Sequence, residues 1–160
     1  MNKVLVSACL LGKRVRYDGG SLAVADRILA QWLAEGRVVS VCPEVDAGMS
    51  IPRRPAEIVE ASGRDVLLAT AKVLDNAGED VTAYFISGAE QALATCQKQG
   101  LRVAVLAESS PSCGSHSLYD GHFSGNKVPG EGVTAALLRQ NGIDVYSQFE
   151  IEAAHKTLIS

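Results

Sequence analysis

Short apolar runs alternate along this chain with stretches in which apolar residues recur at helical spacing. Four runs have the continuous apolar character of buried strands: residues 4–8, 37–41, 103–107 and 143–146. Helical spacing of apolar positions follows in three segments: residues 22–33, 81–96 and 133–140. Alternating strands and helices favour a parallel sheet with helices on its faces. The tail beyond the last strand is expected to be helical.

The region between the second strand and the long helix breaks this alternation. Residues 42–55 are expected to contain no helix, because three prolines fall there. Two short runs, residues 57–60 and 66–69, flank a turn and predict a hairpin attached to the main sheet. We therefore expect one α/β domain over residues 1–160, Rossmann-like and three-layered, with a mostly parallel sheet and a small inserted hairpin.

Composition and net charge limit the expected binding partners and cellular location of the protein. A net charge of −3 lacks the basic excess that is typical of nucleic-acid-binding domains, so no nucleic acid is expected as a partner. No apolar run approaches the roughly 20 residues that cross a membrane, and the start of the chain has no apolar region typical of a signal peptide. The expected location is the cytoplasm, where disulfides are rare. The four cysteines are then expected to serve metal binding, catalysis or packing.

Three cysteines stand directly after predicted strands. Cys9 follows the first strand, Cys42 the second and Cys113 the third. The carboxyl ends of parallel strands meet at one edge of a sheet, which is where open α/β folds bind ligands, so the three thiols are expected to converge there. Cys96 differs because it shares a helical apolar stripe with Phe85, and it is expected to pack in the core.

Three thiols at one edge leave several interpretations open. No Cys-x-x-Cys pair is present, which argues against zinc ribbons and bacterial ferredoxin motifs. Three thiolates leave a four-coordinate metal or a cubane cluster one protein ligand short, and an open position is typical of a reaction site. The alternatives are three unrelated small residues, or one catalytic thiol with a partner base. His116 lies close to Cys113 in sequence, but a histidine in a turn is more often a solvated surface group.

Other polar residues lie near these thiols. Glu44 stands two residues after Cys42 and is placed for proton transfer, although it equally suits an ion pair with Arg53 or Arg54. Ser110 precedes Cys113 by three residues, and a serine there commonly bonds backbone groups to hold a turn. Residues 16–18 belong to the first loop, which leaves the sheet at the same edge, so they are candidates to reach the thiols. The glycines of residues 130–132 either aim helix amides at an anion or form a tight turn into a helix.

Taken in order, these motifs resemble those of a bacterial family, once catalogued as a domain of unknown function, that includes the thiouracil desulfurases. The resemblance extends over nearly the whole chain, through residues 7–12, 15–19, 42–45, 52–58, 78–82, 110–115, 119–121 and 130–135.

The resemblance implies a cofactor and a reaction. It implies a [4Fe–4S] cluster held by Cys9, Cys42 and Cys113, with a fourth iron open to the sulfur of a small thiolated nucleobase such as 2-thiouracil. It also implies catalytic roles for Glu44 and Ser110. The implied reaction is removal of sulfur without net electron transfer.

One departure and two alternatives accompany the resemblance. In the family pattern a lysine often stands two or three residues before Ser110, but here those positions are Glu108 and Ala107. Contacts that depend on that lysine are therefore not expected here. The first alternative is a binding or sensing module with a structural cluster or zinc. The second is a desulfurase or sulfur transferase that acts on another thiolated compound.

Overall fold

Four short strands form one parallel sheet in a computed structural model that describes residues 1–160. The strand order is β2-β1-β5-β8, with β1 at Val4–Ser7, β2 at Val38–Val41, β5 at Val103–Leu106 and β8 at Asp144–Ser147. Each strand lies within one residue of a predicted apolar run. The two central strands, β1 and β5, are buried along their whole length, which is why their sequences carry no polar alternation.

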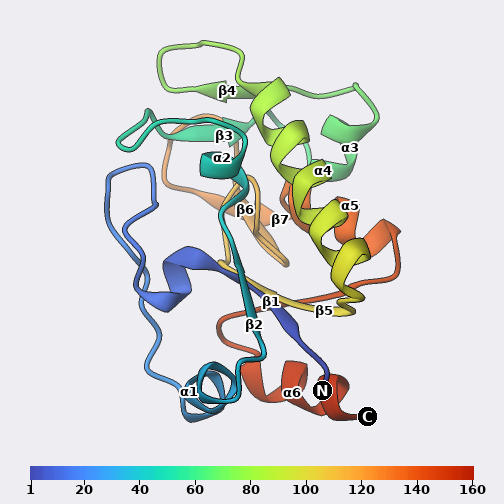
Figure 1. Cartoon of the computed structure of the whole chain (residues 1–160). Helices are drawn as coiled ribbons and strands as arrows, with labels where there is room; N and C mark the ends of the chain where they lie inside the picture. The colour runs from blue at the N-terminus through green and yellow to red at the C-terminus, as the bar shows by residue number, and fades with distance from the viewer.

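Helices cover both faces of this sheet (Figure 1). On one face lie α1 (Arg27–Ala34) and α6 (Ile151–Ile159), and on the other lie α4 (Thr82–Gln99) and α5 (Val133–Gln140). This three-layer arrangement confirms the predicted α/β fold class. None of these helices combines the length and the apolar character that a membrane crossing requires.

The main core lies between the sheet and these helices. Trp32 of α1 is fully buried, and its indole Nε1 donates to His155 Nδ1 of α6 at 3.1 Å. On the opposite face, Cys96 of α4 is 1% exposed and belongs to the same core. The prediction that Cys96 packs in the core is therefore confirmed.

One prediction for the proline-rich segment is wrong. Residues 42–55 contain a single helical turn, α2 (Pro43–Asp46), which begins directly after Cys42. Pro43 occupies the first helical position, where the missing N–H has no intrahelical acceptor and the fixed φ of proline suits a helix. Proline is disfavoured in the interior of a helix but is tolerated in its first turn.

The predicted hairpin is right in its first strand and wrong in its second. β3 (Ala56–Ile58) pairs antiparallel with β4 (Val73–Asp75), as a separate two-stranded sheet and not as an attachment to the main one. The second predicted run instead begins inside α3 (Gly63–Leu67). There the Ser62 amide donates to Asp65 Oδ2 at 2.9 Å, a contact typical of a helix start.

A second antiparallel pair, β6 (Ser117–Tyr119) with β7 (Lys127–Pro129), was not expected from the sequence. Both small pairs lie beyond the carboxyl edge of the main sheet (Figure 1), around a second core that is smaller than the main one. The two pairs and η1 (Ala8–Leu11), a 3-10 turn after β1, enclose the space above that edge.

Candidate active site

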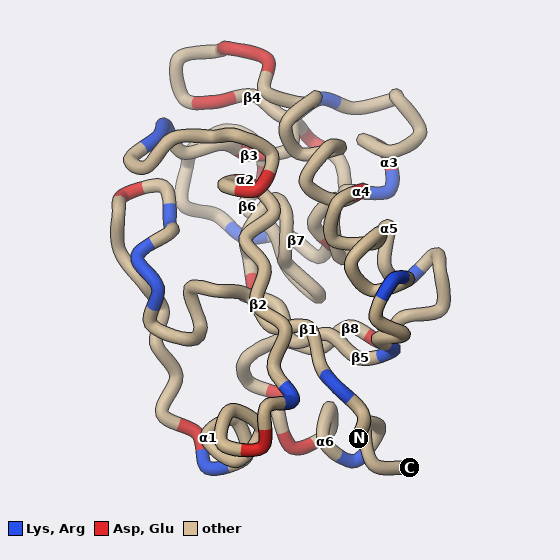
Figure 2. The backbone as a smooth tube through the Cα atoms, in the orientation of Figure 1, with Lys and Arg blue, Asp and Glu red and all other residues tan.

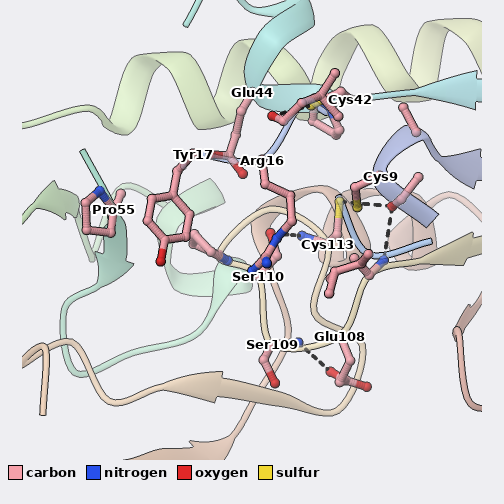
Figure 3. A pocket seen from close by; sticks show the side chains of 18 of the residues that line it. Cys9, Arg16, Tyr17, Cys42, Glu44, Pro55, Glu108, Ser109, Ser110 and Cys113 are labelled. Atoms are coloured by element: carbon pink, nitrogen blue, oxygen red, sulfur yellow. Dashed lines mark hydrogen bonds between the residues drawn. The ribbon is translucent and has the colours of Figure 1, made fainter. Parts of the chain in front are cut away.

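A cavity of about 640 Å³ opens at the carboxyl edge of the sheet. All five predicted site residues line it: Cys9, Cys42, Cys113, Glu44 and Ser110. Figure 3 shows their side chains around one hollow. Strand topology therefore brings together residues that are up to 104 positions apart in the chain (from 9 to 113).

Each cysteine is placed by the turn that ends a strand. Cys9 lies in η1, directly after β1, and Cys42 joins β2 to α2. Cys113 lies in the loop after β5 and is 5% exposed, whereas Cys9 and Cys42 are half-buried. The Cys42 amide donates to Asp46 Oδ2 at 3.1 Å, which fixes the start of α2 below the thiol.

The three thiols are not activated nucleophiles. Burial, together with the nearby Cys42 thiol, raises the pKa of Cys9 to about 11. Burial also raises the pKa of Cys42, and it raises that of Cys113 far above its ordinary value even though the Ser7 hydroxyl acts in the opposite direction. A catalytic thiol needs a lowered pKa. This set instead needs a bound cation to hold its thiolates deprotonated.

The donor set fits a cluster better than a single ion. No three histidine, cysteine, aspartate or glutamate side chains lie close enough together to bind one metal ion. In a [4Fe–4S] cluster each cysteine binds its own iron, so the ligand sulfurs stand further apart than they do around one zinc. Three soft thiol donors that face one cavity match that chemistry.

Glu44 is held on both of its oxygens. Arg53 Nε donates to Oε1 at 3.1 Å, and Ser112 Oγ donates to Oε2 at 3.2 Å. The ion pair considered from sequence therefore forms with Arg53, whose Nη2 also donates to the Val15 carbonyl at 3.0 Å. Each carboxylate oxygen accepts more than one hydrogen bond, so both retain capacity toward the cavity.

Ser110 holds the turn that carries Cys113. Its Oγ accepts the amides of Ser112 at 3.1 Å and Cys113 at 3.2 Å, as expected of a serine in such a loop. Both contacts use the oxygen as acceptor. The hydroxyl hydrogen is therefore available to donate to a molecule in the cavity.

Ser112 is a site residue that the sequence did not reveal. It is fully buried and lies next to Cys113, and its hydroxyl positions the Glu44 carboxylate across 68 residues of sequence. A serine inside a recognised motif carries no sign of such a distant partner.

Glu108, one of the two positions at which this chain departs from the lysine of the family pattern, organises the Cys113 loop. Its Oε1 accepts four backbone amides between 2.9 and 3.1 Å, from Ser109, Ser115, His116 and Ser117. His116 Nδ1 lies 3.3 Å from Oε2 of the same carboxylate, so it faces an acid and not a thiol. The alternative of His116 as a base for Cys113 is not supported.

We expect the Glu108 carboxylate to stabilise the fold in a pH-dependent way. Burial alone raises its pKa, but the amides of His116 and Ser117 and the Ser115 hydroxyl more than offset burial and lower the pKa from 4.5 to about 2. A lowered folded-state pKa adds stability above about pH 4.5, and that stability disappears as the pH falls through about 2.

Glu108→Gln should therefore lower the free energy of unfolding at pH 7 by about 2 kcal/mol, the general size of hydrogen bonds to a charged group. Urea unfolding of the metal-free protein at several pH values measures this. The gap between the two proteins should close as the pH falls from about 4.5 towards 2. A gap that is constant over this range would contradict the assignment.

The glycines before α5 form a tight packing contact and no anion site. A Cβ on Gly132 would lie 2.4 Å from the Ser112 carbonyl oxygen, so only glycine allows this close approach. The first amides of α5 are already used, since Val133 donates to the Pro111 carbonyl at 2.9 Å and Thr134 to the Ser112 carbonyl at 2.8 Å. Of the two interpretations of residues 130–132, the structure supports the tight turn.

The first loop contributes Arg16 and Tyr17 to the cavity wall. Asp18 does not line the cavity, and its carboxylate accepts the Gly20 amide at 2.8 Å within the loop. Two of the three candidates of that loop therefore reach the site.

Comparison with known proteins agrees with this geometry. Residues 4–150 match the family model described as 2-thiouracil desulfurase. The uncharacterized protein YbbK of Bacillus subtilis (strain 168) is 46% identical over 148 residues, which is 92% of this chain and 97% of YbbK. A solved structure of the [4Fe-4S]-dependent thiouracil desulfidase TudS superposes with a TM-score of 0.90 at 46% identity, covering 99% of this chain and 98% of that one. This chain belongs to the 2-thiouracil desulfurase family.

Proposed function

We propose that this protein is a [4Fe–4S]-dependent desulfurase that removes sulfur from a thiolated pyrimidine such as 2-thiouracil without net electron transfer. One observation carries the proposal: three thiols, a carboxylate and a serine hydroxyl, the groups that such a reaction needs, line a single cavity. Family membership and the similarity to TudS support the same activity.

Cys9, Cys42 and Cys113 are the proposed ligands of the cluster. A cluster bound by three cysteines supplies a Lewis-acidic iron with an open position suited to a thiocarbonyl sulfur. Cys113 is buried, and Cys9 and Cys42 are half-buried at the cavity wall.

Glu44 is the proposed general base. Arg53 and Ser112 fix its carboxylate at the cavity wall, so that it accepts a proton from water as the water attacks the thiocarbonyl carbon.

Ser110 is proposed to donate its hydroxyl hydrogen to the bound pyrimidine. On protein of matched iron content, Ser110→Ala should lower kcat/KM for 2-thiouracil, and an unchanged kcat/KM would remove this role.

The substrate is proposed to be a small thiolated nucleobase and not a nucleic acid. The cavity carries both apolar and polar side chains, among them Tyr17, Phe149 and Gln148. Figure 2 shows Lys and Arg positions on several elements together with Asp and Glu positions, and the net charge of −3 lacks the basic excess that is typical of nucleic-acid-binding domains.

We also propose that residues 1–160 act as one domain, because residues from the sheet and from both small strand pairs line the same cavity. A cytoplasmic location is proposed because a site built on three cysteines without disulfides suits a compartment in which disulfides are rare. Cell fractionation with an antibody against the protein tests the location, and recovery outside the cytoplasm would overturn it.

Anaerobic reconstitution tests the activity. The purified protein, supplied with iron and sulfide, should bind about four irons per chain and turn brown. It should then convert 2-thiouracil to uracil. A loaded protein that binds 2-thiouracil but forms no uracil would instead indicate a binding or sensing module.

A further inference from the structure

The buried hydroxyl of Ser7 is a polar group for which the proposed reaction gives no role. Ser7 is the last residue of β1 and is 3% exposed. Its Oγ accepts the Ala107 amide at 3.0 Å and lies 3.6 Å from Cys113 Sγ. Both contacts are buried and join Ser7 to residues that are 100 and 106 positions away in the chain.

The direction of these two bonds follows from the donor count. An amide can only donate, so the Ala107 contact uses the Ser7 oxygen as acceptor. The single hydroxyl hydrogen is left for the sulfur. Ser7 is thus held from one side by Ala107, the residue directly after β5, and directs its hydrogen at Cys113.

Among the three thiols, Cys113 is the one that accepts from a side-chain hydroxyl, whereas backbone amides, those of Leu10 and Val45 among them, stabilise the Cys9 and Cys42 thiolates and act to lower their pKa. Cys42 Sγ lies 3.9 Å from the Val15 carbonyl, a contact in which the thiol must be the donor and which a metal-bound thiolate loses. Cys113 is also the most buried of the three, so water does not replace a lost donor there.

We propose that Ser7 is a positioning residue whose hydroxyl donates to the Cys113 thiolate when that thiolate holds the cluster, and that this bond raises the reduction potential of the cluster and strengthens its retention. The inference rests on the proposed function, because it requires a cluster on Cys113. Hydrogen bonds to ligand sulfurs raise the potential since they stabilise the more negative, reduced cluster. Loss of a group that hydrogen-bonds a metal ligand typically lowers the metal affinity by roughly 10–100-fold.

The test compares Ser7→Ala with Ser147→Ala in anaerobically reconstituted protein. Ser147 is a matched control because it ends the parallel strand β8 and is 2% exposed, and its Oγ accepts the Phe149 amide at 3.2 Å without touching a thiol. Measurements are the reduction potential of the cluster and the loss of iron to a ferrous chelator.

Ser7→Ala should give a more negative potential than the wild type and about 10-fold weaker retention of iron, while Ser147→Ala leaves both unchanged. If Ser7→Ala loads no cluster although its metal-free form keeps the wild-type circular dichroism and unfolding midpoint, the proposal is also supported. Equal potentials in Ser7→Ala and wild type, equal shifts in both variants, or an unfolded metal-free Ser7→Ala would overturn it. A wild type that binds no cluster overturns the proposed function itself, which distinguishes the two failures.

Discussion

Cys113→Ala protein will bind no [4Fe–4S] cluster and release no sulfide from 2-thiouracil. Cys113 is the most deeply buried of the three cysteines at the cavity, and no fourth protein thiol lies there to replace it. The same loss is expected for Cys9→Ala and Cys42→Ala. The measurements are the visible absorption spectrum and the iron content after anaerobic reconstitution.

Cys96→Ala is the matched control. Cys96 is as buried as Cys113 but packs in the main core on α4, outside the cavity. Its variant should have a free energy of unfolding lower by roughly 0.5–3 kcal/mol, the usual range for single substitutions, and should keep the cluster spectrum. A cluster that survives in Cys113→Ala, or that disappears from a folded Cys96→Ala, would contradict the ligand assignment.

Glu44→Gln should keep the cluster and lose turnover by a factor of about 10²–10⁴, the usual contribution of a general base. The amide preserves the size of the side chain and accepts a hydrogen bond from Arg53 or Ser112, but it cannot take a proton from water. Steady-state kinetics with 2-thiouracil, on protein of matched iron content, measure the loss in kcat.

Glu57→Gln separates a catalytic carboxylate from a structural one. Glu57 lines the same cavity, but its Oε1 accepts the amides of Gly121 at 3.0 Å and Phe123 at 3.2 Å, contacts that a glutamine oxygen retains. Its kcat should stay close to that of the wild type. Equal losses in the two variants would show that Glu44 is not the base.

The fold could be predicted from sequence where the pattern is long enough. The buried strands β1 and β5 show as continuous apolar runs, and α5 was predicted with the bounds that the structure has. β4 and β7 are only three residues long, and every residue of β7 is exposed, so no apolar period marks them. The one-turn helix α2 departs from the prediction because Pro43 stands at the first helical position, where proline is tolerated.

The site residues also fall into those that the sequence predicts and those that it does not. The convergence of the three cysteines follows from parallel topology, which places strand ends at one edge. Ser7, Ser112 and Glu108 act through hydrogen bonds to groups that no local pattern indicates. Two of these contacts join residues that are 106 and 68 positions apart, so they depend on how the finished fold packs.

The most direct test of the central claim is the fate of oxygen and sulfur in one reaction. Loaded protein is given 2-thiouracil in ¹⁸O-labelled water without reductant, and sulfide and uracil are quantified, the uracil by mass spectrometry. If water replaces the sulfur of C=S by oxygen, one sulfide is released for each uracil formed, and that uracil carries one ¹⁸O. Unlabelled uracil, or turnover that occurs only with added reductant, would contradict hydrolytic desulfuration at this cavity.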